Sequence, residues 1–374
     1  MEAKHPRAKM ANPSNQTHRV TLRQLCNLGL PAPILLPSLL PAIRALVPSS
    51  HAAFFYCDAS GNMTNIYAER MLPPEAMALY YERYYRDDKV AFSKAYLGRV
   101  NSHEPVSRKT VTSAEQETGY YRDVLSVLDA EHVLYGIVRS PHNGHEALGQ
   151  LSLYRGRDES AFTTQDAAAL KDVLHYLSSA LVNDPQAVLR SPTEQTAEEA
   201  MAVLAEDGEV MFADEAWSRM VRMARGEAIS PGNARDEPRA IAAFIQGVLK
   251  AARASKRALH WVESPWGRFV FRHHDLDAAG TTKRLVAGTT AKATALVLSR
   301  LANESVRLTE GAAKLDLSSQ QREVALMIAL GLTNAEIGEK LGVSVNTAGY
   351  HVKQVFAKLN VHERGEVAQL LRAA

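Results

Sequence analysis

Polar side chains recur at helical spacing near the end of the chain, within "VSVNTAGYHVKQVFAKL" (residues 343–359). They fall opposite an apolar face that consists of Ala348, Val352, Val355 and Leu359. Amide, hydroxyl and ammonium groups along one side of a helix are the groups that read base edges in the major groove of DNA. The residues expected to face DNA are Asn346, Thr347, Gly349, Tyr350, Lys353, Gln354 and Lys358.

These residues suit different parts of a DNA duplex. Lys353 and Gln354 can donate to acceptors on base edges, whereas Lys358 and Arg364 are better placed for phosphates. Gly349 is unusual, because glycine inside a helix costs about 1 kcal/mol relative to alanine. The apolar spacing continues on both sides of it, so no kink is indicated. We interpret Gly349 as an outward position without a side chain, which lets the helix approach the groove closely.

The elements around this helix are predicted from capping signals. Capping-box spacing at Ser318 and at Thr333 predicts helices over residues 318–330 and 333–341. Gly342 supplies a tight turn before the third helix, and a fourth helix is expected over residues 363–372. Two helices joined by a short glycine turn are typical of the helix-turn-helix, whose second helix lies in the major groove.

The whole segment resembles the LuxR-type (GerE-type) helix-turn-helix of bacterial transcription regulators. The residues that carry the resemblance are Leu317, Arg322, Glu323, Val324, Gly331, Leu332, Thr333, Asn334, Glu336, Ile337, Leu341, Gly342, Val343, Ser344, Thr347, His351, Val352, Lys358, Leu359 and Val361. The resemblance implies a four-helix DNA-binding domain whose fourth helix supports dimerisation. It also implies RNA polymerase as a partner. One departure is Gly349, where relatives often carry a lysine. The alternative is a helical bundle that merely packs.

The small net charge of this segment predicts that one copy binds DNA weakly. From Gly311 onward the chain carries seven Lys and Arg against six Asp and Glu, which is 7 − 6 = +1, and the whole chain has a net charge of +2. One copy therefore has too little charge to bind DNA tightly alone. With Val367 and Leu371 as apolar residues of the last helix, we expect a homodimer on half-sites about one helical turn apart.

Two α+β units precede this segment. The first contains two hairpin patterns, "HAAFFYCDASGNMTNIYAE" and "EHVLYGIVRSPHNGHEALGQLSLYRG", and a closing helix in "FTTQDAAALKDVLHYLSSALV". It resembles a GAF-type domain. The second begins with "AVLAEDGEVMFADEAWSRMV" and continues with strand patterns in "RALHWVES", "GRFVFRHHDL" and "KRLVAGTTA". It resembles a PAS domain.

The expected fold is therefore multidomain, with two α+β sensor-type domains before an all-α four-helix domain. A helix with Val297, Leu301 and Leu308 on one face is expected to connect the two parts, either paired with a second copy or packed on the preceding sheet. The predicted limits are a flexible tail (1–20), a GAF-like domain (21–182), a linker (183–196), a PAS-like domain (197–290), the connector helix (291–310) and the helix-turn-helix domain (311–374).

Tyrosines near the middle of the first unit suggest a place for an effector. GAF and PAS folds wrap a sheet around a space that can hold a small molecule. Tyr80, Tyr84 and Asp87 are candidates to line it. Alternatively, the tyrosines pack in the core and the carboxylate caps or solvates the helix end. The stretch also resembles acyl-homoserine-lactone domains, but Lys89 follows Asp88 where those domains have proline, so that ligand is not predicted.

The sequence shows no motif for metal binding, catalysis or phosphate binding. Hydrophobic residues make up 46% of the chain and charged residues 22%, as in ordinary globular proteins. Cys26 and Cys57 have no metal-binding spacing, and no nucleophile elbow or phosphate-binding loop appears. We therefore expect no catalytic residues, no metal, no cofactor and no membrane span, in a cytoplasmic protein. The predicted function is a bacterial sequence-specific transcription regulator that responds to a small-molecule effector. The alternative is a ligand-independent regulator controlled by a protein partner or by abundance.

Overall fold

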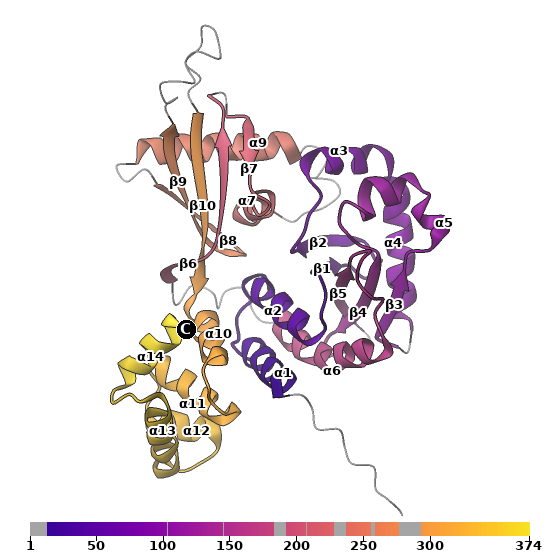
Figure 1. The fold of residues 1–374 in the computed structure, drawn as a ribbon. Helices are drawn as coiled ribbons and strands as arrows, with labels where there is room; N and C mark the ends of the chain where they lie inside the picture. Colours follow the sequence, from indigo (N-terminus) through magenta and orange to yellow (C-terminus); the bar gives the residue numbers. More distant parts are fainter. Residues whose placement is uncertain are drawn as a thin grey trace, which may run out of the picture.

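The computed structural model of the chain describes residues 13–102, 104–144, 146–182, 192–206, 208–227, 237–255, 259–276 and 293–374. One five-stranded sheet, β6–β10, lies at the upper left of Figure 1, the other, β1–β5, lies at the right, and a group of C-terminal helices lies at the lower left. Helices of the first unit fill the space between its sheet and the C-terminal helices. In the part of the chain that is described, no helix is long and apolar enough to cross a membrane.

The first sheet has the strand order β2-β1-β5-β4-β3, with every neighbouring pair antiparallel. Its strands are β1 (His51–Cys57), β2 (Met63–Ala68), β3 (Val106–Thr110), β4 (His132–Arg139) and β5 (Ala147–Arg155). Both hairpins expected from the sequence are confirmed, because β1 pairs with β2 and β4 pairs with β5.

Helices cover both faces of this sheet. One face packs against α2 (Ala32–Leu46) and α6 (Thr164–Leu181) through the buried leucines of the core, and α1 (Pro13–Cys26) packs on these two helices. The other face meets α4 (Tyr85–Val100), which follows α3 (Pro74–Arg83). A short α5 (Ser113–Gln116) and a π-helical turn, η1 (Tyr121–Leu125), complete the unit. The closing helix α6 is capped by Thr163, whose side chain accepts from the Asp166 backbone N–H.

The second sheet repeats this strand order, as β7-β6-β10-β9-β8. Its strands are β6 (Pro192–Leu204), β7 (Val210–Ala213), β8 (Leu259–Ser264), β9 (Gly267–Leu276) and β10 (Ala293–Asn303). The helices α7 (Trp217–Arg225) and α9 (Glu237–Ala254) pack on it. In both sheets the first strand therefore lies between the second and the fifth.

The two sheet units share one hydrophobic core. Buried side chains form a continuous cluster from Leu22 in α1 to Phe271 in β9. Tyr67 of the first sheet and Trp266 of the second face each other with ring centroids 5.3 Å apart. The second unit therefore lies fixed against the first, because separating them would expose this apolar surface to water.

The expected connector helix over residues 291–310 is wrong in its first part. Residues 293–303 form β10, the central strand of the second sheet, paired with β6 on one side and β9 on the other. The apolar spacing of Val297 and Leu301 was compatible with either structure, and hydrogen bonding on both strand edges decides for the strand. The helix α10 (Glu304–Lys314) follows at once, capped by Asn303, whose Oδ1 accepts from the Ser305 N–H at 3.0 Å.

Two further expectations need correction. The predicted tail over residues 1–20 ends earlier, because α1 begins at Pro13 and buries Leu22 and Leu25 beside α2 and α6. The predicted linker over residues 183–196 also ends earlier. Residues 192–196 belong to β6, since they pair with the end of β10. Residues 1–12 and the strand expected in "KRLVAGTTA" lie outside the described residues.

A glycine allows α10 to lie directly on the last helix, α14 (Arg364–Ala373). A Cβ atom placed at Gly311 would collide with the carbonyl oxygen of Leu371. The two helix backbones are therefore in contact at this point.

We expect Gly311→Ala to loosen α14, because overpacking at a backbone contact costs about 1–3 kcal/mol. Hydrogen exchange of the α14 amides in the full chain should speed up on the order of tenfold or more. Gly365→Ala, in α14 itself, is the matched control: nothing lies within 4 Å of the added Cβ, so exchange should slow or stay the same. Equal protection of α14 in the two variants would show that the close approach is not required.

Candidate nucleic-acid interface

The four helices expected at the end of the chain are confirmed. They are α11 (Ser319–Ala329), α12 (Asn334–Leu341), α13 (Val345–Leu359) and α14. The capping boxes at Ser318 and Thr333 both form. Gly342 ends α12 with a φ of 66°, a left-handed conformation that glycine adopts without strain. Ser344 then caps α13 by accepting the Thr347 N–H at 3.2 Å.

The inward face of α13 holds it against α11 and α12. Ala348, Val352 and Val355 are buried in a separate hydrophobic cluster of the C-terminal helices, and Leu359 is half-buried at its edge. The apolar spacing seen in the sequence thus fixes the rotation of α13 about its axis. The opposite face must then point outward.

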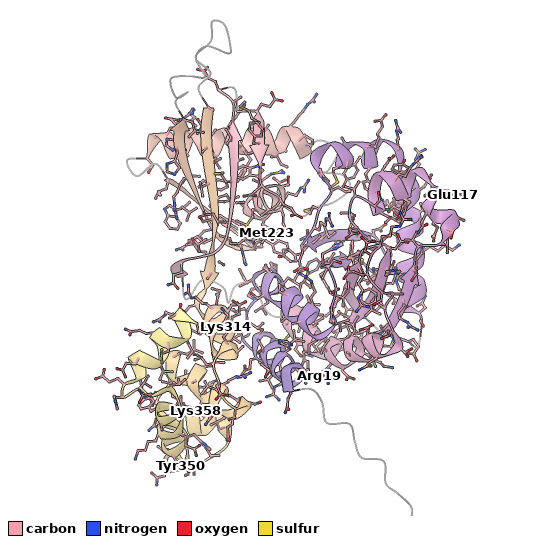
Figure 2. All side chains as sticks on the ribbon, viewed as in Figure 1. Arg19, Glu117, Met223, Lys314, Tyr350 and Lys358 are labelled. Atoms are coloured by element: carbon pink, nitrogen blue, oxygen red, sulfur yellow. The ribbon has the colours of Figure 1, made fainter. Side chains whose placement is uncertain are left out.

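The outward face of α13 carries the residues expected to meet DNA. Its exposed members are Asn346, Thr347, Tyr350, Lys353, Gln354 and Lys358. Tyr350 is 60% exposed, which excludes it from the core. Tyr350 and Lys358 lie in the lower part of Figure 2, on the C-terminal helices and far from the two sheets. Neither sheet unit therefore covers this face.

The two lysines of α13 differ in their surroundings. The Nζ atom of Lys358 lies 2.6 Å from Oδ2 of Asp316, and this hydrogen bond lowers the pKa of Asp316. Lys353 has no hydrogen bond or ion pair with any described residue. Lys353 is thus available for DNA as it stands, whereas Lys358 must first leave a carboxylate.

Gly349 is half-buried beside the start of α12. A Cβ atom added there would lie 3.5 Å from Nδ2 of Asn334, which is an ordinary van der Waals distance. Packing within the chain therefore does not require glycine at this position. Gly349 and Lys353 also line a hollow of about 580 Å³ that reaches Arg364.

Arg364 was interpreted as a phosphate contact, and the structure gives it a different role. Its Nη1 donates to the carbonyl oxygen of Leu332 at 2.6 Å, and its Nη2 donates to Oδ1 of Asn334. Arg364 thus ties the beginning of α14 to the beginning of α12. No spacing in the sequence indicated this contact, because the partners are separated by two helices.

Val367 and Leu371 do not form an outward face. Both are fully buried, because α10 and α11 pack on that side of α14. The apolar residues that suggested a dimer surface thus belong to the core of one copy. Leu370, 36% exposed, lies on the free side of the helix.

The tyrosine-rich segment of the first unit is internally hydrogen-bonded. The hydroxyl of Tyr80 donates to Oδ2 of Asp88 at 2.7 Å, and the hydroxyl of Tyr84 donates to Oδ2 of Asp123 at 2.6 Å. Tyr120 donates to the other oxygen of Asp88 at 3.1 Å. Asp87 is exposed. The carboxylates beside the tyrosines are therefore Asp88 and Asp123, and not Asp87.

Sequence reasoning missed a polar cluster between α4 and the first sheet. Nε of Arg99 donates to Oε1 of Gln150 at 2.9 Å, and Nε2 of Gln150 donates to Oγ of Ser152 at 3.1 Å. The Arg99 guanidinium also lies 4.1 Å from the centroid of the Tyr135 ring. The sequence "GQLSLY" (residues 149–154) could have indicated this cluster. Gln150, Ser152 and Tyr154 stand at every second position of a buried strand, so their side chains share one face. In the described part of the chain, no group of His, Cys, Asp or Glu could hold a metal ion.

Comparisons with known proteins agree with the geometry of the C-terminal helices. Residues 315–371 match the family "Bacterial regulatory proteins, luxR family". Over 55 residues, 15% of this chain and 28% of the relative, the chain is 38% identical to the "Putative HTH-type transcriptional regulator YhjB" of Escherichia coli. It spans between 21% and 28% of the length of the curated relatives it matches.

Two solved structures show slighter likenesses. One is the N-acylhomoserine-lactone-dependent LuxR family factor CepR2 from Burkholderia cenocepacia, with 16% identity, a TM-score of 0.32, and coverage of 45% of this chain and 99% of that one. The other is the GAF domain of the cyanobacteriochrome TePixJ, with 13% identity, a TM-score of 0.31, and coverage of 46% and 96%.

The capped helices, the glycine turn and the family match lead to the same conclusion. Residues 315–371 form a helix-turn-helix domain of the luxR family of bacterial regulatory proteins.

Proposed function

We propose that this chain is a sequence-specific transcription regulator of bacteria that places α13 in the major groove of DNA. The observation that carries the proposal is the exposed polar face of α13, held outward by the buried face of a luxR-type domain. In the proposed complex, Lys353 and Gln354 would donate to base edges, Asn346 would contact the groove near the start of the helix, and Tyr350 would lie against a base or sugar. RNA polymerase is the partner that a regulator of this class would engage.

We also propose that the protein binds DNA as a homodimer. The weak positive charge of the C-terminal segment supports this, and Lys358 is held by Asp316 and is not free to meet a phosphate. Val367 and Leu371 are buried within one copy, so the contact must use another surface, with Leu370 on the free side of α14 as a candidate.

The two sheet units are proposed to be sensor domains, GAF-like and PAS-like. Their common strand order and the helices on both faces of the first sheet support this. A small effector would enter between α4 and the first sheet, where Arg99, Gln150 and Tyr135 offer hydrogen bonds and an aromatic wall. Tyr80 and Tyr84 would close this space. Effector binding would then favour one arrangement of the dimer over another.

Selection of binding sites from random duplex DNA tests the proposed function directly. The full-length chain should enrich a pseudo-palindrome whose half-sites lie about one helical turn apart. Sedimentation of the complex should then give two chains per site. The DNA-binding role fails if no sequence is enriched, and the dimer fails if one chain occupies each site.

We expect Lys353→Ala to weaken binding to the selected site by about 1–3 kcal/mol, because a base contact is lost. Lys250→Ala is the matched control, since Lys250 is also exposed but lies on α9, away from α13. Both variants should be titrated by fluorescence anisotropy at one salt concentration. Equal affinities for the two variants would remove Lys353 from the interface.

Gly349 gives a prediction in which stability and affinity move in opposite directions. Gly349→Ala should stabilise α13 by about 0.5–1 kcal/mol, because alanine favours the helix and its Cβ meets only Asn334 at 3.5 Å. It should nevertheless weaken DNA binding, because the added methyl group holds the helix away from the groove.

Amide exchange in α13 and a titration with the selected DNA measure the two effects. Gly349→Lys is the second variant, and it should steepen the salt dependence of binding by about one phosphate contact. Close approach is not the reason for this glycine if Gly349→Ala binds DNA as tightly as the wild-type chain.

A further inference from the structure

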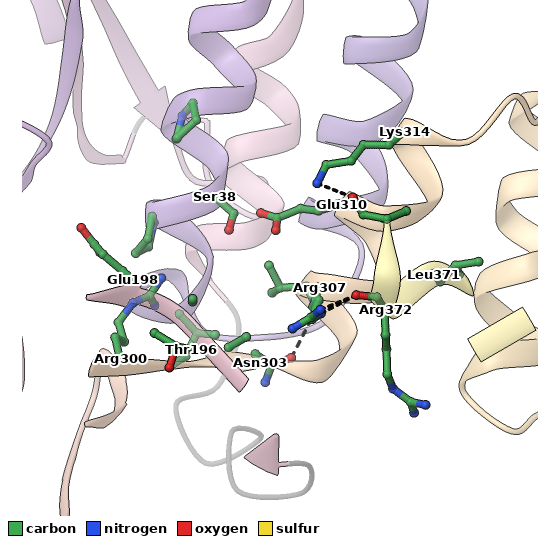
Figure 3. A pocket seen from close by; sticks show the side chains of 18 of the residues that line it. Ser38, Thr196, Glu198, Arg300, Asn303, Arg307, Glu310, Lys314, Leu371 and Arg372 are labelled. Carbon is green, nitrogen blue, oxygen red and sulfur yellow. Dashed lines mark hydrogen bonds between the residues drawn. The ribbon is translucent and has the colours of Figure 1, made fainter. Parts of the chain in front are cut away.

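A cleft of about 540 Å³ lies where the two sheet units meet the C-terminal helices. Its walls come from α2, from the ends of β6 and β10, from α10 and from the last residues of α14. Figure 3 shows Arg300 entering this cleft from β10 and Glu310 entering it from α10. Its volume is in the range of small-molecule sites in proteins.

Arg300 is a buried cation with few partners. Its side chain is 8% exposed, and Nη1 makes one long hydrogen bond of 3.4 Å to the carbonyl oxygen of Trp266. Nε is buried without a partner among the described residues. A guanidinium has five N–H donors, and leaving them unsatisfied in a buried place costs free energy. An anion in the cleft would remove that cost.

The nearby carboxylates are largely committed to other cations. Glu198 pairs with Arg219, and Glu69 pairs with Arg44 at 3.2 Å. Glu198 and Glu310 both attract the Arg300 guanidinium, Glu198 the more strongly, but Glu310 has no ion pair with any described residue. The side chains of four basic residues line the cleft against these three acidic ones, which is 4 − 3 = +1. The basic residues are Arg219, Arg300, Arg307 and Lys314, whereas the Arg372 guanidinium points away and pairs with Glu304 at 2.6 Å.

The opposite wall is apolar. Ile34, Pro37 and Pro41 of α2 line it together with Val306 of α10. A ligand that satisfies both walls has a charged oxygen head and a short apolar body. We propose that the cleft binds a small organic anion, with its carboxylate or phosphate group on Arg300 and its apolar body against the prolines of α2.

The position of this site connects it to the DNA-binding domain. Nε of Arg307 donates to the carbonyl oxygen of Arg372 at 3.1 Å, and Nζ of Lys314 donates to the main-chain oxygen of Ala374 at 2.7 Å. Both cations line the cleft while they hold the end of α14. A bound anion competes for them and so changes how α14 lies on α10. This consequence for DNA rests on the proposed function, whereas binding of the anion does not.

Binding is tested on the full-length chain without DNA, by equilibrium dialysis and calorimetry. The probes are benzoate, phenyl phosphate and inorganic phosphate, with uncharged benzamide as the control for the apolar body. We expect benzoate or phenyl phosphate to bind with a Kd below about 10 mM and benzamide not to bind. The stronger of the two identifies the preferred head group. Failure of all the anions at that concentration, or equal binding of benzamide, overturns the proposal.

Two substitutions should act in opposite directions. Arg300→Met should weaken anion binding about tenfold or more, whereas Glu310→Gln should strengthen it several-fold by removing the opposing charge. Arg268→Met is the control, because Arg268 pairs with Glu263 on the exposed side of the same sheet and does not line the cleft. Glu310→Gln keeps the shape of the side chain, so it decides the matter even if Arg300→Met does not fold. Unchanged affinity in Glu310→Gln contradicts the assignment.

A last measurement separates this site from the proposed function. Affinity for the selected DNA should change at least several-fold when the anion saturates the cleft. Anion binding without any such change would leave the site in place and would refute its coupling to DNA.

Discussion

The orientation of the DNA-binding helices depends on one junction, at Asn303. The central strand of the second sheet, β10, ends there and α10 begins with no loop between them. The side chain of Asn303 caps the helix, and Gly311, about two turns further on, brings α10 against the backbone of α14. Strand, helix and helix thus form a continuous rigid path. A shift of β10 within its sheet must move α10, because no flexible residues separate them.

The shared core extends this constraint to the first unit. The contact of Tyr67 with Trp266 and the cluster around α1 and α2 hold the two sheets together. The face of α13 nevertheless lies open on the far side of the C-terminal helices. A signal in either sheet would therefore not act by uncovering a hidden DNA surface. In the proposed dimer it would act by changing the relative placement of the two copies.

Most of the C-terminal domain could be predicted from local signals in the sequence. Capping boxes, the turn at Gly342 and the spacing of the buried face of α13 each depend on residues a few positions apart, and all of them appear in the structure. Residues 293–303 illustrate the limit of such signals, because a short apolar run suits a strand and a helix equally until its partners are known. Arg364, Val367 and Leu371 show the same limit for side chains. Their neighbours come from other helices, so no local pattern reveals whether they face outward. In the tyrosine cluster, Asp87 was the expected carboxylate, but Asp88 accepts the hydrogen bonds. One position along a helix rotates the side chain by about 100° about the helix axis.

The electrostatics of the interface suggest how it gains specificity. Lys358 is engaged by Asp316, Arg364 by the start of α12, and Gly349 has no side chain at a position where relatives often carry lysine. Three positive charges that would meet phosphates are thus withheld or absent. Affinity that comes from phosphates is independent of sequence, so its reduction lowers binding to all DNA alike. The groups that remain on the exposed face are Asn346, Tyr350, Lys353 and Gln354. These are groups that contact bases and sugars at short range, and they act only where the helix lies deep in the groove. In the proposed function, a module of this kind would discriminate between sequences through close fit, and it would depend on a second copy to supply the affinity that one copy lacks.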